Sequence, residues 1–149
     1  MFKKLFISLA LLAAATAVWA QNDDDRIPDN KELISRARTV NVDTDTFFMK
    51  REALESALLG RKEFKAWGLR VTGRRDRADL LIHVQRVPFS NHFSYTVTDR
   101  TTETVVMAGK VDSLAGTVYD LIADEIVHKM KEFRGDPLAA QAAAPQAQP

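Results

Sequence analysis

Residues 79–111 read DLLIHVQRVPFSNHFSYTVTDRTTETVVMAGKV, and this stretch decides the fold. Apolar and polar residues alternate in three runs, which is typical of β-strands that bury one face and expose the other. Turn-forming residues separate the runs at positions 88–91 and 100–103. The stretch therefore predicts three sequential strands joined as an antiparallel meander.

The alternation also fixes a register between the first two of these strands. Pairing Ile82 with Val97 and Val84 with Tyr95 gathers both apolar sets on one face, whereas a slip of one residue would turn that face to water. The third strand is expected to continue the apolar face with Val105, Met107 and Val111. The opposite face is expected to be mostly polar and to carry Leu81, His83, Gln85, Ser94, Thr96, Thr98 and Val106.

Upstream of the meander, residues 39–43 alternate as a half-buried strand does. A helix is predicted over 49–59 because its apolar residues share one face. Gly60 should interrupt it, since glycine costs about 1 kcal/mol relative to alanine inside a helix. A short helical turn around Phe64 and a short strand at 69–71 are expected to follow.

Downstream of the meander, residues 114–133 have the spacing of one long amphipathic helix. Its polar side carries Asp120, Asp124, His128 and Lys131. Burial of each large apolar member contributes about 1.5–3 kcal/mol, so this helix should dominate the stability of the domain. The apolar stripe consists of Ala115, Val118, Tyr119, Ile122, Ile126, Met130 and Phe133.

This order of elements predicts an α+β fold, a two-layer α/β sandwich. A mixed, mostly antiparallel sheet of four to five strands should carry two helices on one face. We assign residues 34–135 to a single domain. Polar and Ala/Gln/Pro-rich composition predicts disorder for 21–33 and for 136–149.

The first twenty residues have the three parts of an export signal. Lys3 and Lys4 precede an apolar run that is too short to span a bilayer, and small residues lead to Ala20. We predict a signal peptide over 1–20, cleavage near Ala20, and a periplasmic or secreted mature protein that does not span the membrane. With no cysteine, that protein has neither disulfides nor a lipid-attachment site.

Charge is balanced overall but uneven along the chain. The 21 basic and 20 acidic residues leave nothing that points to nucleic acid as a partner. Residues 61–77, here called the basic stretch, hold seven basic side chains against two acidic ones. Such a stretch favours either an anionic ligand or an ordinary solvated loop region. The candidate binding residues within it are Arg70, Arg74, Arg75 and Arg77, while Phe64 and Trp67 are expected to be core anchors.

Motifs that carry chemistry are missing from the sequence. It has no G-x-S-x-G, no H-E-x-x-H, no glycine-rich phosphate loop and no cysteine nucleophile. Asp124 and His128 share a helix face, which indicates a solvated pair, and His83 and His92 are interpreted as ordinary sheet residues. We therefore predict no enzymatic activity, no catalytic residue, no metal site and no cofactor.

Three segments together resemble a known family: ADLLIHV at 78–84, YTVTD at 95–99 and VMAGKV at 106–111. With the helix LIADEIVHKM at 121–130, they are similar to the N-terminal domain of TolB and related bacterial envelope accessory domains. The resemblance spans about residues 78–135 and does not include the β-propeller that follows this domain in TolB. It implies a periplasmic protein-interaction domain without enzymatic activity.

Two functions are thus expected from the sequence. The first is a non-enzymatic interaction or accessory domain of the bacterial cell envelope, whose partner is another envelope protein. A sheet edge that accepts a partner strand is one way in which it would act. The second is a module that binds an anionic envelope ligand, either a lipid head group or a wall polymer, through the basic stretch.

Overall fold

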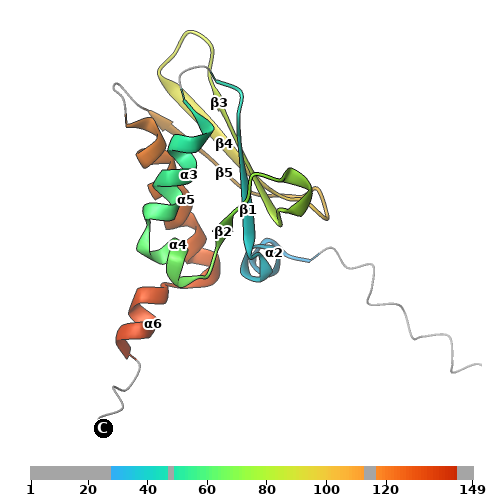
Figure 1. Ribbon diagram of the computed structural model, residues 1–149, viewed down its shortest axis with the longest axis vertical. Helices are drawn as coiled ribbons and strands as arrows, with labels where there is room; N and C mark the ends of the chain where they lie inside the picture. The colour runs from blue at the N-terminus through green and yellow to red at the C-terminus, as the bar shows by residue number, and fades with distance from the viewer. Residues whose placement is uncertain (1–27, 47–48, 113–116, 144–149) are drawn as a thin grey trace, which may run out of the picture.

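The computed structural model describes residues 28–46, 49–112 and 117–143. Figure 1 shows their arrangement. In chain order the elements are α2 (Asn30–Arg36), β1 (Thr39–Thr44), α3 (Arg51–Gly60), α4 (Lys62–Ala66), β2 (Arg70–Val71), η2 (Arg75–Arg77), β3 (Leu80–Arg86), β4 (His92–Asp99), β5 (Val105–Asp112), α5 (Val118–Arg134) and α6 (Pro137–Ala143).

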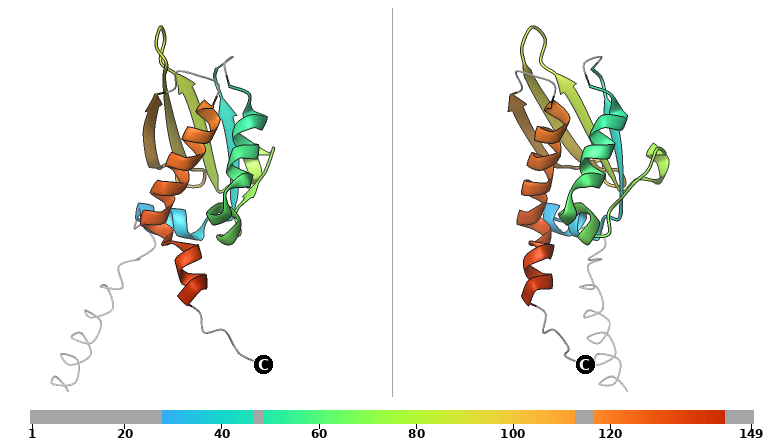
Figure 2. Two further views of the ribbon diagram at one scale, coloured as in Figure 1. Left: turned by 90° about the vertical axis from the view of Figure 1, so that its left-hand side faces the viewer. Right: turned by 60° about the vertical axis from the view of Figure 1, so that its left-hand side comes forward.

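The strands form one five-stranded sheet in the order β2-β1-β3-β4-β5. Strand β1 runs parallel to both of its neighbours, while β3, β4 and β5 are antiparallel. Helices α3 and α5 lie side by side on one face of the sheet (Figure 2). No described α-helix covers the other face, which the short 3-10 helix η2 borders through Arg75. The predicted α+β, two-layer fold is therefore confirmed.

The meander has the predicted register. Ile82 pairs with Val97 and Val84 with Tyr95, and all four side chains are buried. Alternate residues of β3 and β4 face α3 and α5, because period-2 alternation leaves no other way to bury the apolar set.

Strand β5 departs from the prediction at its start. Val97 pairs with Met107 but Thr98 pairs with Val105, so Val106 is the extra residue of a β-bulge. Val106 is only 3% exposed and belongs to the core, whereas Val105 is 52% exposed. The prediction had assigned these two valines to the opposite faces. It was wrong because alternation counted along the sequence does not reveal an inserted residue.

Helix α5 buries most of the predicted stripe. Val118, Ile122, Ile126 and Met130 are buried in the core, with Tyr119 and Phe133 packed against it. The helix begins at Val118, and residues 114–116 of the prediction lie outside the described part of the chain. Because α5 contacts α2, α3 and β5, it packs elements from the first and the last parts of the chain together.

Helices α2 and α6 fall partly in segments predicted to be disordered. The Asp29 carboxylate accepts a hydrogen bond from the Glu32 backbone N at 2.7 Å, which caps α2. Leu33 and Ile34 of this helix are fully buried, so the ordered part begins earlier than residue 34. Helix α6 lies within 136–149 and buries no residue. The predicted signal peptide and residues 21–27 lie outside the described residues.

The connection between α3 and β2 agrees with the prediction. Helix α3 ends at Gly60, Arg61 is extended, and α4 begins at Lys62. Phe64 and Trp67 are buried, and the Trp67 indole N–H donates to the Gly135 carbonyl oxygen at 3.2 Å. Both aromatic residues are therefore core anchors, as expected.

Candidate functional site

The four candidate arginines of the basic stretch lie on β2 and on the loop that leads to β3, and all are exposed. Two of them are already paired. Arg74 Nη2 lies 2.6 Å from Asp76 Oδ2, and Arg75 Nη1 lies 3.6 Å from Asp43 Oδ2. The hydrogen bond from Arg74 lowers the pKa of Asp76, so this pair is charged at neutral pH. Arg70 and Arg77 have no ion pair among the described residues.

The fold brings a third exposed arginine to Arg70 and Arg77. The Arg70 backbone N donates to the Arg38 carbonyl oxygen at 3.0 Å, and the Thr39 hydroxyl lies 3.1 Å from the Arg77 carbonyl oxygen. Arg38 also has no ion pair within the described residues. We call Arg38, Arg70 and Arg77 the arginine edge. The backbone of all three residues lies beside the beginning of β1.

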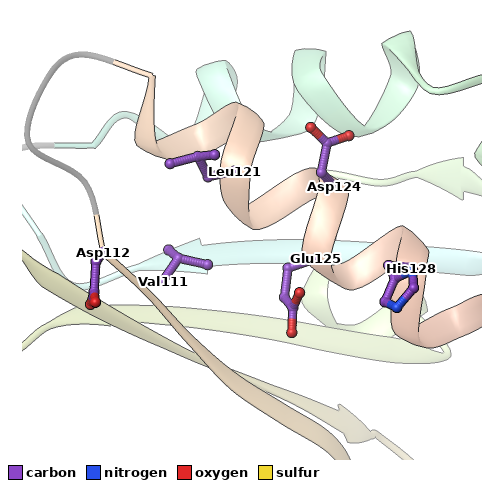
Figure 3. A pocket seen from close by; sticks show the side chains of 6 residues that line it. All are labelled: Val111, Asp112, Leu121, Asp124, Glu125 and His128. Carbon is purple, nitrogen blue, oxygen red and sulfur yellow. The ribbon is translucent and has the colours of Figure 1, made fainter.

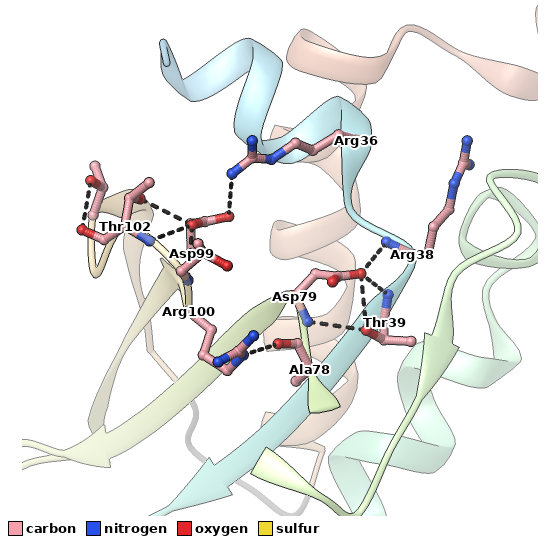
Figure 4. Close-up of polar contacts among 10 residues, drawn as sticks. Arg36, Arg38, Thr39, Ala78, Asp79, Asp99, Arg100 and Thr102 are labelled. Atoms are coloured by element: carbon pink, nitrogen blue, oxygen red, sulfur yellow. Dashed lines mark hydrogen bonds and ion pairs between the residues drawn. The ribbon is translucent and has the colours of Figure 1, made fainter. Parts of the chain in front are cut away.

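The arginine edge rests on the carboxylate of Asp79. One oxygen of Asp79 accepts hydrogen bonds from the Arg38 backbone N at 2.7 Å and from the Thr39 backbone N and hydroxyl at 2.9 Å each (Figure 4). Burial opposes ionisation of Asp79, but these hydrogen bonds outweigh it and lower the pKa of the carboxyl. The Arg38 side chain points away from Asp79 and is left to solvent (Figure 4).

A second buried carboxylate holds the turn between β4 and β5. Asp99 is 3% exposed, and its Oδ1 accepts from the Thr101 and Thr102 backbone N–H groups and from the Thr102 hydroxyl. Its Oδ2 lies 3.5 Å from Arg36 of α2 (Figure 4). These contacts satisfy Asp99 completely, which indicates a structural role for it and for Arg36.

The two edges of the sheet are both protected. Strand β2 is only two residues long. On β5 the Lys129 ammonium of α5 donates to the Ala108 carbonyl oxygen at 2.6 Å and pairs with Glu125 at 3.5 Å. A lysine held over an edge carbonyl discourages the addition of another strand.

Beside β5 runs an open groove of about 390 Å³, which α5 borders on its other side. Figure 3 shows the six residues that line it. Asp124 points away from the sheet in this view, where its carboxylate pairs with Arg61 at 2.8 Å. The Asp124 carboxylate is thus paired with Arg61 and not with His128. Arg61 of the basic stretch in turn has its charge neutralised by α5. The lining residues are Val111, Asp112, Leu121, Asp124, Glu125 and His128.

The face of the sheet without α-helices, which we call the open face, is mainly polar as predicted. Its strand residues include Leu81, His83, Gln85, Ser94, Thr96, Thr98, the exposed Val105, Ala108 and Lys110, together with Asp43 of β1.

Three donor groups meet at the β1 border of the open face. His83 Nε2 lies 3.3 Å from Asp45 Oδ2, and His83 Nδ1 lies 4.0 Å from Asp43 Oδ2. We call Asp43, Asp45 and His83 the donor cluster. Among the described residues it is the group of three such side chains whose ligand atoms all lie within 4.8 Å of one another. His92, interpreted with His83 as an ordinary sheet residue, instead contacts Asp112 on β5.

Arg38, Asp43 and Asp45 were not predicted as members of these clusters. Asp43 and Asp45 are two residues apart beside a predicted strand, and that spacing was the available signal for a shared face. Asp43 and Asp45 lie near His83 because β1 pairs in parallel with β3, and Arg38 lies near Arg70 because β2 runs beside β1. The strands of both pairs are far apart in the chain. No local pattern specifies that pairing.

Comparisons with known proteins add little to this description. No family model and no curated protein sequence matches the chain. Two solved structures of PelC dodecamers from Paraburkholderia phytofirmans, one of a single-residue variant, are each 13% identical to it, with TM-scores of 0.33 and 0.31. The alignments cover 68% and 63% of this chain and 86% and 85% of the PelC chains. A likeness this low supports no inference, and the resemblance to the TolB N-terminal domain stays a prediction.

Within residues 28–46, 49–112 and 117–143, none of the helices combines the length and the apolar character that crossing a bilayer requires.

Proposed function

We propose that the mature protein is a non-enzymatic interaction or accessory domain of the bacterial cell envelope, exported by its signal peptide, and that the open face is its contact surface. The observation that carries this proposal is the one-sided cover of the sheet, since α3 and α5 lie on a single face. The other face presents hydroxyl, amide and imidazole groups on a rigid framework, and such groups suit a polar protein interface.

We favour contact through the open face over the addition of a partner strand at an edge of the sheet. The Lys129 ammonium donates a hydrogen bond to the Ala108 carbonyl oxygen on β5, and β2 has only two residues that could pair with a partner strand. A partner strand would first have to displace that ammonium, whereas the open face is accessible without rearrangement.

Site-specific crosslinking in cells tests the proposal. A photoreactive amino acid at Gln85, exposed on the open face, should give one reproducible adduct with another envelope protein. The matched control has the same amino acid at Leu59 of α3, which is 43% exposed on the helical side, and should not give that adduct. Absence of any reproducible adduct from Gln85, or the same adduct from both positions, contradicts the proposal.

A second candidate function, the binding of an anionic envelope ligand, is favoured by one observation. Arg38, Arg70 and Arg77 carry three guanidinium groups without acidic partners among the described residues. Guanidinium groups bind carboxylates and phosphates through paired hydrogen bonds. The ligand class is therefore a carboxylated or phosphorylated lipid or polymer.

Matched arginine variants separate this function from general attraction to charge. Replacing Arg70 and Arg77 with Gln should weaken binding to vesicles containing an anionic phospholipid, or to an anionic wall polymer, and the wild-type affinity should fall steeply with salt. Replacing Arg74 and Arg75 with Gln removes the same formal charge but affects side chains already paired with Asp76 and Asp43. Equal losses in the two variants, or no loss in either, would exclude a site at the arginine edge.

A further inference from the structure

The parallel pairing of β1 with β3 places three potential metal ligands next to one another. Asp43 is directly opposite His83 in the register, and the Asp45 backbone N continues the ladder by donating to the Val84 carbonyl oxygen at 3.0 Å. Because Asp43 and Asp45 are two residues apart, both side chains reach the open face beside the imidazole. Their positions are thus set by the backbone of two neighbouring strands.

Distances within the donor cluster are close to those of a coordinated ion. Zinc ligands lie about 2.0–2.2 Å from the metal, so ligand atoms in a tetrahedral site are roughly 3–4 Å apart. Here one ligand atom from each side chain, with a single imidazole nitrogen from His83, lies within 4.8 Å of the other two. Small side-chain rotations would suffice for all three groups to reach one ion.

A fourth donor lines the same cavity. This cavity of about 100 Å³ is bordered by Asn41, Asp43 and His83 among others. Asn41 is 5% exposed, and its amide nitrogen is fixed by a 2.8 Å hydrogen bond to the Thr72 carbonyl oxygen. Within the described residues the Asn41 side-chain oxygen accepts no hydrogen bond. Because Asn41 lines the same cavity, this oxygen is available as a further ligand for an ion held by the cluster.

We propose that Asp43, Asp45 and His83 bind a divalent transition-metal ion of the zinc type. The imidazole nitrogen favours Zn²⁺, Co²⁺ or Ni²⁺ over Mg²⁺ and Ca²⁺, which prefer oxygen ligands alone. Three protein ligands leave at least one coordination position for water, for the Asn41 oxygen or for a donor from a partner molecule. The site is separate from the arginine edge and goes beyond the proposed function.

Arg75 competes with the metal for this site. Its guanidinium lies 3.6 Å from Asp43 Oδ2 and borders the same cavity, so it neutralises one ligand when no ion is bound. Arg75 is 70% exposed and lies on the loop before β3, which allows it to move away. Removal of its charge should therefore tighten metal binding.

Titration of the purified, untagged chain with Zn²⁺ and Co²⁺ tests the proposal. Calorimetry should give one ion per chain, and Co²⁺ should show visible absorption bands that change on coordination by nitrogen. His83→Ala should weaken binding at least about tenfold, since even the loss of a supporting residue costs 10–100-fold. His92→Ala, which removes a histidine paired with an aspartate on the same sheet, and His128→Ala should bind as the wild type does.

Two further variants separate ligation from folding and from general charge effects. The Asp45 side chain is 67% exposed, so Asp45→Asn should leave the circular dichroism and urea unfolding unchanged while weakening metal binding about as much as His83→Ala. Arg75→Gln should bind Zn²⁺ severalfold more tightly. If the wild type binds no ion, or if His83→Ala and Asp45→Asn bind as the wild type does, the cluster is only a hydrogen-bonded surface group and the proposal is overturned.

Discussion

The antiparallel half of the sheet, β3 to β5, and the parallel half, β2, β1 and β3, differ in how far apart in the chain their partners lie. Strands β3 and β4 are joined by residues 87–91, whereas β1 and β3 are separated by residues 45–79, which include α3, α4 and β2. A hairpin sets its register through its turn, but a parallel pair needs a long crossover and has no such local guide.

The difference extends to what each half contains. The antiparallel half is closed by a satisfied buried carboxylate, Asp99, and by apolar pairs such as Ile82 with Val97. The parallel half gathers the arginine edge and the donor cluster, which leave charged groups exposed. Local pairing therefore stabilises the fold, and distant pairing assembles the candidate sites.

The largest effect is expected from helix α5, which supplies Ile122, Ile126 and Met130 to the core. Ile126 is fully buried, so Ile126→Asp places a carboxylate in the core without a partner and should cost more than about 4 kcal/mol. The urea unfolding transition should be lost or shifted close to zero denaturant. Leu121→Asp on the same helix, at a position 42% exposed, is the control and should change stability by less than about 0.5 kcal/mol. An Ile126→Asp protein as stable as this control would contradict the described core.

Asp79→Ala should weaken the parallel half specifically. It removes the acceptor of three hydrogen bonds from Arg38 and Thr39, and we expect a loss of about 3 kcal/mol in the free energy of unfolding at pH 7. Hydrogen exchange should increase most in β1 and β2. If hydrogen exchange increased equally in β4 and β5, the two halves of the sheet would not differ in local stability as expected.

The same variant should show a defined pH dependence. Because the folded-state pKa of Asp79 is lowered, its ionisation stabilises the protein above the unfolded pKa of about 3.9, and this contribution is lost as the pH falls through the folded pKa. The stability difference between wild type and Asp79→Ala should therefore shrink below about pH 4. Urea unfolding at pH 7 and pH 3 measures it, and a constant difference would exclude this linkage.

Gly109→Ala should damage the antiparallel half. A Cβ at this position would lie 2.6 Å from ring atoms of the buried Tyr95, so the ring or the backbone would have to shift. We expect a loss of about 2 kcal/mol. Gly73→Ala, where a Cβ meets nothing within 4 Å, is the matched control and should be nearly neutral. Thermal unfolding of both variants makes the comparison, and equal stability would contradict the close approach of Tyr95 to β5.

The smallest effect is expected in the turn between β4 and β5. Glu103 has φ 55°, a left-handed conformation that glycine adopts without steric cost. Glu103→Gly should raise stability by up to about 1 kcal/mol, whereas Glu103→Ala, which keeps the Cβ, should not. The denaturant midpoints of Glu103→Gly and Glu103→Ala distinguish these outcomes. If Glu103→Ala were also more stable than the wild type, the increase in stability would have a cause other than the left-handed conformation.

Much of the fold was predictable because its signals are local. Alternation specified β3 and β4, the short turn between them limited their register, and helical spacing specified α5. The bulge at Val106 was not predictable, since an inserted residue leaves the composition of the strand unchanged. Helix α2 was missed although Asp29 and Glu32 have cap spacing, because polar composition was given more weight than the buried pair Leu33 and Ile34.

The candidate sites were predictable only in part. The four candidate arginines of the basic stretch are exposed, and their role in binding stays a prediction. The acidic partners of Arg74 and Arg75 were not predicted. The distance from Asp43 to His83 depends on which residues of β1 and β3 face each other. Sequence periodicity does not contain that information, because any even shift preserves the buried faces.

The parallel register of β1 and β3 is the claim on which the donor cluster depends, and backbone NMR contacts between the two strands test it most directly. Cross-strand nuclear Overhauser effects should link Asn41 with Leu81, Val42 with Ile82 and Asp43 with His83. Contacts displaced by two residues, or an antiparallel set between these strands, would contradict the account, because Asp43 and His83 would then no longer lie side by side.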